Sequence, residues 1–178
     1  MPTILTHPAV PLAIGVGLGS NIIPRRLLLA GVVAAILPDL DVIGIQLGVE
    51  RGTQFAHRGF THSLAFALGV ALACAFAARS LRTPALVAFL YVFVSTASHG
   101  VLDSFTNGGN GIAFLWPFSD ERFYAPWRVI EVSYIGAGWL LSARGLTVLA
   151  SELLWVWLPA ALLGFGLMLA RRKTPASG

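Results

Sequence analysis

Long apolar runs alternate with short polar segments along the chain, and this pattern predicts transmembrane helices. The apolar runs cover residues 9–23, 27–37, 63–78, 84–102 and 146–170. A helix needs roughly 20 apolar residues to cross the hydrocarbon core, and fewer when it is buried among neighbours. The last run is the clearest span, whereas the first is short for a full crossing. We therefore predict an all-α, polytopic membrane bundle of about four to five membrane helices, in a single domain over residues 1–178.

The stretch 104–144 breaks this pattern because it is rich in Gly, Trp, Pro and Tyr. Turn residues together with aromatic residues are typical of a loop at the membrane surface. We predict an interfacial loop region here, between the last two membrane helices, with a short helix near 129–139. Residues 171–178 follow the last apolar run and are predicted to form a cytoplasmic tail.

The composition agrees with a membrane protein. Hydrophobic residues make up 56% of the chain and charged residues 11%, against roughly 45–50% and about 25% in soluble domains. The net charge of +4 does not indicate a nucleic-acid partner, because the basic residues are scattered beside apolar runs rather than gathered in a stripe. The lipid bilayer is the expected partner.

The basic residues also predict an orientation. Arg25 with Arg26, Arg79 with Arg82, and residues 171–173 lie in short connections that alternating spans place on one side. By the positive-inside rule this side is cytoplasmic. We therefore expect a bacterial inner-membrane protein with a cytoplasmic C-terminus.

The same alternation places every histidine and most acidic residues on the opposite, periplasmic face. Among them are His7, Asp39, Asp41, His57, His62, His99, Asp103 and Glu131. An ionisable group at the centre of a membrane costs at least ~2.5–3.5 kcal/mol, so such groups are normally paired, ligated or in contact with water. Their grouping at one end of the bundle predicts a metal site.

Two short motifs carry most of this prediction. His99 and Asp103 are four residues apart and therefore lie on one face of a helix, where they can chelate an ion or form an ordinary hydrogen bond. Asp39 and Asp41 follow Pro38 at the end of an apolar run, so they mark a helix end or break. Their two carboxylates can bind one cation or bridge two.

The remaining histidines are further candidates. Thr61 is a plausible N-cap of the third helix, which would place His62 in the first helical turn as a neutral ligand. His57 is expected to be a ligand or a general acid/base, and His7 a further ligand from the N-terminal segment. A histidine at a membrane interface can also be incidental. Glu131 is expected to pair with Arg128 on the same helical turn.

In this order, four segments resemble the YdjM family of bacterial inner-membrane proteins, which are described as metal-dependent hydrolases. The segments are Thr6-His7, residues 37–41, residues 57–63 and residues 98–103, and the resemblance extends over about the first 135 residues, including Trp116-Pro117-Phe118. The His99–Asp103 spacing is also similar to zinc phospholipase C and P1 nuclease. This chain departs from them because it has only four histidines and no HxxxE motif, so we expect one or two ions rather than three.

The resemblance implies a membrane-bound hydrolase with a divalent metal, zinc first and manganese or magnesium as alternatives. Asp39, Asp41, His62, His99, Asp103 and His7 are the expected ligands, and His57 and Asp41 the expected catalytic residues. Arg58 and Arg128 lie on the same face and can bind either a substrate phosphate or anionic lipid head groups. The expected substrate is a phosphate-containing lipid or lipid-linked molecule. The alternatives are a transporter or ion-binding protein and a non-catalytic scaffold, and the oligomeric state stays open.

Overall fold

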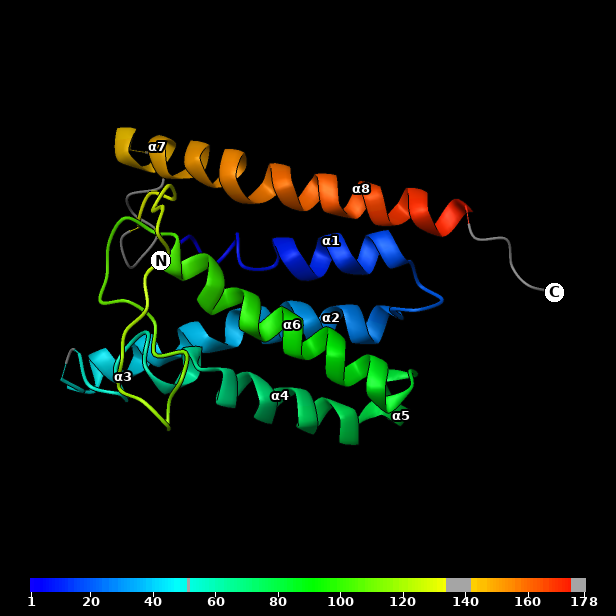
Figure 1. Cartoon of the computed structure of the whole chain (residues 1–178), viewed down its shortest axis with the longest axis horizontal. Coiled ribbons are helices and arrows are strands. Elements are labelled where there is room, and N and C mark those ends of the chain that lie inside the picture. The colour runs from blue at the N-terminus through cyan, green and yellow to red at the C-terminus, as the bar shows by residue number, and fades with distance from the viewer. Residues whose placement is uncertain (51, 134–141, 174–178) are drawn as a thin grey trace.

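The structure, a computed structural model, describes residues 1–50, 52–133 and 142–173, and this part of the chain is helical without β-strands (Figure 1). Short 3₁₀ turns occupy Leu37–Asp41 and Phe60–His62, and a π-helical turn occupies Leu153–Trp157. The α-helices are α1 (Ala9–Leu18), α2 (Arg25–Ile36), α3 (Val42–Gln46), α4 (Leu64–Phe76), α5 (Ala78–Leu81), α6 (Ala85–Ser104), α7 (Ala143–Glu152) and α8 (Leu158–Lys173).

Three continuous helical segments are long and apolar enough to cross a membrane. They are Arg25–Gly44, Ala85–Ser104 and Ala143–Lys173, and α1 and α4 are shorter apolar helices. The last segment, of 31 residues, confirms the clearest span expected from the sequence. Its end differs from the expectation, because residues 171–173 belong to α8; residues 174–178 lie outside the described residues.

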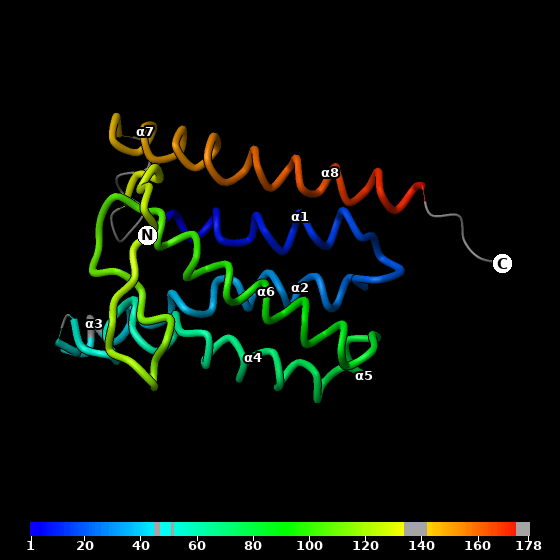
Figure 2. The backbone as a smooth tube through the Cα atoms, viewed as in Figure 1, coloured from blue at the N-terminus to red at the C-terminus, as the bar shows by residue number. Residues whose placement is uncertain are grey.

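The helices form a bundle in which α1 packs against α8, and α6 packs against both α2 and α4 (Figures 1 and 2). Glycines allow the close contacts. The Cβ position of Gly17 on α1 lies 2.8 Å from the carbonyl oxygen of Gly164 on α8, so only a glycine fits at this crossing. Gly31 on α2 meets the ring of Tyr91, whose hydroxyl donates to the carbonyl of Pro11 at 2.9 Å. Tyr91 thereby joins α6 to α1 across α2.

The basic groups gather at one end of the bundle, where the α1–α2 connection, α5 and the end of α8 lie (Figure 1). Arg26 donates to the carbonyl of Ser80 at 2.9 Å. Gly19 has a positive φ of 79°, and its Cβ position overlaps the guanidinium of Arg171. The described ends of α2, α6 and α8 therefore agree with the alternation that the sequence predicted.

Two local expectations were wrong. Ser63, not Thr61, is the N-cap of α4, because its hydroxyl accepts the N–H of Phe66 at 3.1 Å. His62 therefore precedes the helix in a 3₁₀ turn instead of lying in the first turn of α4. The short helix expected near 129–139 is absent over 129–133, and the rest of that range lies outside the described residues.

The contact between Gly31 and Tyr91 predicts the effect of a single methyl group. In Gly31→Ala the new Cβ would lie 2.3 Å from Cε1 of Tyr91, so we expect a loss of about 1–3 kcal/mol from overpacking. Gly69→Ala on α4 is the matched control, because nothing lies within 4 Å of its Cβ position. Thermal unfolding of the two purified variants in detergent measures the difference. Equal unfolding temperatures would contradict the packing described here.

Candidate metal centre

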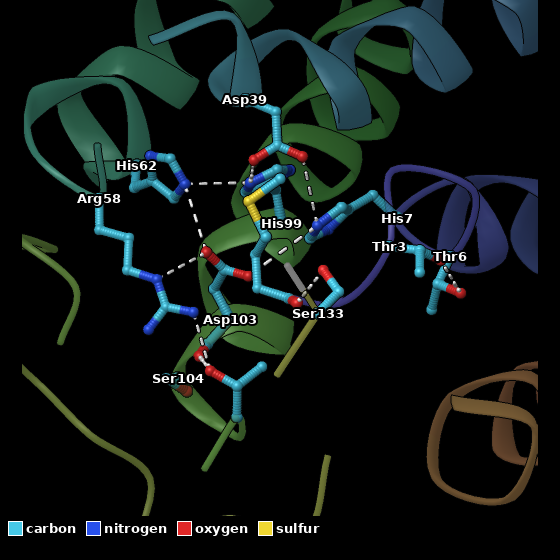
Figure 3. A network of polar contacts seen from close by, with 12 residues as sticks. Thr3, Thr6, His7, Asp39, Arg58, His62, His99, Asp103, Ser104 and Ser133 are labelled. Atoms are coloured by element: carbon cyan, nitrogen blue, oxygen red, sulfur yellow. Dashed lines mark hydrogen bonds and ion pairs between the residues drawn. The ribbon is translucent and has the colours of Figure 1, made fainter. Parts of the chain in front are cut away.

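Five ionisable side chains from four separate stretches meet at the end of the bundle opposite the basic groups (Figure 3). His7 comes from the segment before α1, Asp39 from the 3₁₀ turn after α2, and His62 from the turn before α4. His99 and Asp103 come from the last turns of α6. The expected convergence of these histidines and carboxylates is present in the structure.

The Nε2 atoms and carboxylate oxygens of these residues form a ring. Nε2 of His62 lies 3.0 Å from Nε2 of His99, which lies 3.3 Å from Oδ1 of Asp39. Nε2 of His62 also lies 3.4 Å from Oδ2 of Asp103. His7 closes the ring, since its Nε2 lies 3.7 Å from Oδ2 of Asp39 and 3.9 Å from Oδ1 of Asp103. We call these five residues the donor ring.

The spacing of the donor ring fits a divalent cation. Zinc binds nitrogen and oxygen at about 2.0–2.2 Å, so neighbouring donors around one ion lie about 3.0–3.4 Å apart in octahedral or tetrahedral geometry. The ring distances run from 3.0 to 3.9 Å. Small side-chain movements therefore suffice to bring the donors to bonding distance.

Burial makes the unpaired atoms of the ring informative. Its five side chains are 0–5% exposed, and within the described residues both nitrogens of His7 and both oxygens of Asp39 and Asp103 make no regular hydrogen bond. Buried polar groups are normally hydrogen-bonded. The unpartnered atoms fit the residues' predicted role as metal ligands.

The net charge of the site also fits a divalent cation. Asp39, Asp41 and Asp103 contribute three carboxylates, and Arg58 is the cation paired with Asp103. When the imidazoles are in the neutral form that binds metal, these four side chains leave two negative charges, which one divalent ion would neutralise. The donor set, its geometry and its charge therefore all fit such an ion.

Neighbouring groups orient two of the imidazoles. Nδ1 of His99 lies 2.7 Å from the carbonyl oxygen of Ala35. Because a carbonyl only accepts, Nδ1 carries the proton and Nε2 presents its lone pair to the ring. Nδ1 of His62 faces Oδ2 of Asp41 at 3.3 Å, which directs its Nε2 into the ring in the same way.

The electrostatics of the ring differ from one histidine to the next. Burial, assisted by His99, lowers the pKa of His7 to about 3 and keeps its imidazole neutral. Burial alone would also lower the pKa of His62, but the nearby carboxylates of Asp103 and Asp41 raise it to about 9. The carboxylates therefore favour positive charge at the position where His62 meets the ring.

The DxD motif is divided between two environments. Asp39 faces the ring, whereas Asp41 lies behind His62, where it accepts from the hydroxyl of Thr61 at 2.7 Å and contacts Nδ1 of His57 at 2.7 Å. A 3₁₀ helix has three residues per turn, so positions two apart cannot share a face. The expected ligand Asp41 thus contacts Nδ1 of His57 and of His62 and does not face the inside of the ring.

His57 lies at the edge of the site. Its side chain is 17% exposed, in contrast to those of His7, His62 and His99, which are fully buried. His57 also forms a second possible ligand group with Asp39 and His62.

Arg58 contacts the donor ring through Asp103. Its Nε lies 3.2 Å from Oδ2 of Asp103, and its two terminal nitrogens donate to the carbonyl of Gly108 at 2.7 Å and the hydroxyl of Thr106 at 2.8 Å. Gly109, with a φ of 93°, leaves room for the guanidinium, because its Cβ position lies 2.2 Å from Nη1 of Arg58.

The other two polar candidates lie outside the ring. Arg128 is exposed and stacks on the ring of Tyr124 at 5.2 Å. Glu131 does not pair with Arg128 as expected. It pairs with Arg144 at 2.7 Å and accepts from Asn107 at 2.8 Å. The hydrogen bond from Asn107, followed by that from Arg144, lowers the pKa of Glu131.

One buried acidic residue was missed by the sequence analysis. Glu152 is 1% exposed and accepts hydrogen bonds from Thr3 and Thr6, directly before His7. Its signal was available, because it is the single carboxylate in the apolar run 146–170, and an ionisable residue within a span indicates a functional role.

The helices and the site define a class of protein: a membrane protein of apolar helices with a buried histidine–carboxylate cluster at one end. The chain belongs to the YdjM family, whose model, described as YdjM inner membrane protein, matches residues 1–174. The match extends beyond the first 135 residues on which the resemblance was based.

A relative agrees with this assignment. The chain is 51% identical over 174 residues to the inner membrane protein YbcI of Escherichia coli (strain K12), covering 97% of this chain and 100% of the relative. No solved structure matches the chain.

The burial of Arg58 predicts a stability defect when its charge is removed. Arg58→Gln would leave Asp103 buried without its guanidinium, and breaking a buried ion pair costs about 3–5 kcal/mol. Arg128→Gln is the control, because this side chain is exposed and forms a cation–π contact with Tyr124, whose loss should change little. Unfolding in detergent compares the two variants. A similar effect of both would show that the pair with Asp103 contributes no net stability.

Proposed function

We propose that the protein is a membrane-embedded, divalent-metal-dependent hydrolase that acts on a phosphoester of a lipid or lipid-linked substrate. The observation that carries the proposal is the donor ring, in which three imidazoles and two carboxylates converge at cation-ligand spacing. Zinc is the best candidate for nitrogen-rich coordination, and manganese or magnesium are alternatives. The two ligand groups, His7–His99–Asp103 and Asp39–His57–His62, allow one or two ions.

The residues divide into binding and proton-transfer roles. A divalent ion polarises a phosphoryl oxygen and lowers the pKa of coordinated water to about 7. His57 is partly exposed and hydrogen-bonded through Nδ1 to Asp41, so its Nε2 can accept or donate a proton at the edge of the site. Asp41 fixes the tautomer of His57 and also contacts His62, which couples proton transfer to the ring.

The arginines have separate roles in this proposal. Arg58 contacts Asp103 and can neutralise a phosphate only where that phosphate approaches the ring. Arg128 is exposed and can contact the phosphate or an anionic head group at the surface.

The surroundings of the site favour a lipid substrate. A cavity of about 440 Å³ lies beside the end of α6, lined by Leu102, Phe105, Trp127, Val129, Ile130 and Trp155. Leu102 and Phe105 flank Asp103 in sequence, and aromatic residues are enriched at membrane interfaces. An acyl chain in this cavity would leave its phosphate head near the donor ring.

We infer the membrane topology from the basic end. With the three long apolar segments and one or both of the shorter apolar helices counted, the bundle would have four to five membrane helices, and the positive-inside rule places the basic end in the cytoplasm. The donor ring then lies toward the periplasmic face of the bacterial inner membrane, with a cytoplasmic C-terminus.

One observation favours a second candidate function, an ion-binding protein or transporter. The side chains of the ring are 0–5% exposed, and structural or transported ions are commonly enclosed, whereas catalytic ions keep an open position. The site lies at one end of the bundle rather than at the membrane midplane, where transporters bind their substrates. A scaffold without catalysis remains the third alternative.

The first prediction of this proposal is the presence of metal. Full-length protein purified in detergent should contain one or two divalent ions per chain by elemental analysis. His99→Ala should lose most of this metal because it removes the central nitrogen of the ring, whereas Glu121→Gln, at an exposed carboxylate, should retain it. A wild-type protein without metal, even after incubation with zinc, would exclude both the hydrolase and the ion-binding function.

The second prediction concerns turnover. Zinc-loaded protein in detergent should release phosphate or a phosphorylated head group from phospholipids, and chelation or Asp41→Ala should abolish the release. His57→Ala should lower the rate about 10²–10⁴-fold, as expected for a general acid or base. If the protein binds metal without turnover, zinc flux into proteoliposomes distinguishes a transporter from a scaffold. Turnover that survives both chelation and Asp41→Ala would refute the mechanism.

A further inference from the structure

Glu152 is a buried carboxylate that the proposed chemistry does not use. It is the last residue of α7, 1% exposed, and lies in the 31-residue apolar segment Ala143–Lys173. A carboxylate at such a position is costly unless it is paired or hydrogen-bonded. Its partners therefore indicate what it does.

Within the described residues, the carboxylate of Glu152 forms its hydrogen bonds with the N-terminal segment. Oε1 accepts the backbone N–H of Thr3, and Oε2 accepts the hydroxyls of Thr3 and Thr6, each at 2.8 Å. The indole N–H of Trp157 also donates to the hydroxyl of Thr6, at 3.2 Å. The last membrane segment therefore holds the chain directly before His7.

The π-helical turn Leu153–Trp157 allows Glu152 and Trp157 to contact Thr6 together. In an α-helix with 3.6 residues per turn, residues five apart point about 140° away from each other. A π turn has a wider repeat, which brings Glu152 and Trp157 closer to one face, and such turns often occur at functional sites. Both side chains can thus reach Thr6.

His7 depends on this anchor more than the other ring members do. Asp39, His62, His99 and Asp103 come from α2, α4 and α6 or from turns beside them, and these helices pack against one another. His7 instead precedes α1, stacks on the ring of His99 at 3.6 Å, and has no hydrogen bond to either nitrogen within the described residues.

We propose that Glu152 is a positioning residue, which fixes Thr3 and Thr6 so that His7 completes the donor ring as a metal ligand. This inference rests on the proposed metal site. Replacing a hydrogen-bonded partner of a metal ligand typically changes metal affinity 10–100-fold. Glu152 acts in a comparable way, through the backbone of the segment that carries His7.

The test compares zinc affinity in single and double variants of the full chain in detergent. Glu152→Gln keeps the shape but loses one of the two acceptor oxygens, and Thr6→Val is a milder variant that removes one donor. Both should weaken zinc binding about 10–100-fold in competition with a chelator. Glu121→Gln, the same substitution at an exposed site, should leave the affinity unchanged.

A double-mutant cycle separates positioning from general stability. In the His7→Ala background, Glu152→Gln should cause no further loss beyond about twofold, because its route to the ion has been removed. A purely structural role would lower the affinity equally in both backgrounds, and that result would overturn the inference. An unchanged affinity in Glu152→Gln and in Thr6→Val would overturn it as well.

A second readout does not depend on metal. Acylation of histidines by diethylpyrocarbonate, followed by mass spectrometry, should be slow at His7 in the wild type and several-fold faster in Glu152→Gln, with His99 unchanged. Wild-type protein without zinc affinity but with this change at His7 would refute the metal function and leave the anchor standing. Zinc binding with no response at His7 would refute the anchor and leave the metal function standing.

Discussion

The fold is organised around buried negative charge. Asp39, Asp41 and Asp103 have side chains at most 3% exposed, and the guanidinium of Arg58 pairs with one of them, Asp103. Burying a carboxylate without a partner costs several kcal/mol, and this cost increases when like charges lie close together. The bundle therefore cannot close at this end unless positive charge is present among the carboxylates. The imidazoles that lie beside these carboxylates help to meet the same requirement.

This constraint explains why the site needs most of the chain. Asp39 and Asp103 come from segments more than sixty residues apart, and His7 comes from a third segment, which Glu152 of the last membrane segment binds through Thr3 and Thr6. The close crossings at Gly31 and Gly17 bring the helices carrying these residues together. The donor ring therefore depends on the packing of the helices, because this packing brings its charged groups together.

The sequence predicted the helices and the ring residues because apolar runs and ionisable residues among them are strong signals. It could not separate Asp39 from Asp41, since the DxD spacing does not reveal the 3₁₀ turn that points them in different directions. Thr61 looked like a cap, but Ser63 takes that role and frees Thr61 to contact Asp41. The partner of Glu131 was also hidden, because Arg144 reaches it only through tertiary packing.

The exposure of the histidines indicates how chemistry would reach a site this enclosed. The side chains of His7, His62 and His99 are fully buried, and only that of His57, at 17%, meets the surroundings. Asp41 is hydrogen-bonded to His57 at 2.7 Å and lies 3.3 Å from Nδ1 of His62, so it connects the exposed edge to the donor ring. In the proposed mechanism, a substrate approaching from the membrane interface would meet His57 first, so the residue assigned to proton transfer would also be the most exposed histidine, while the buried imidazoles would bind the ion.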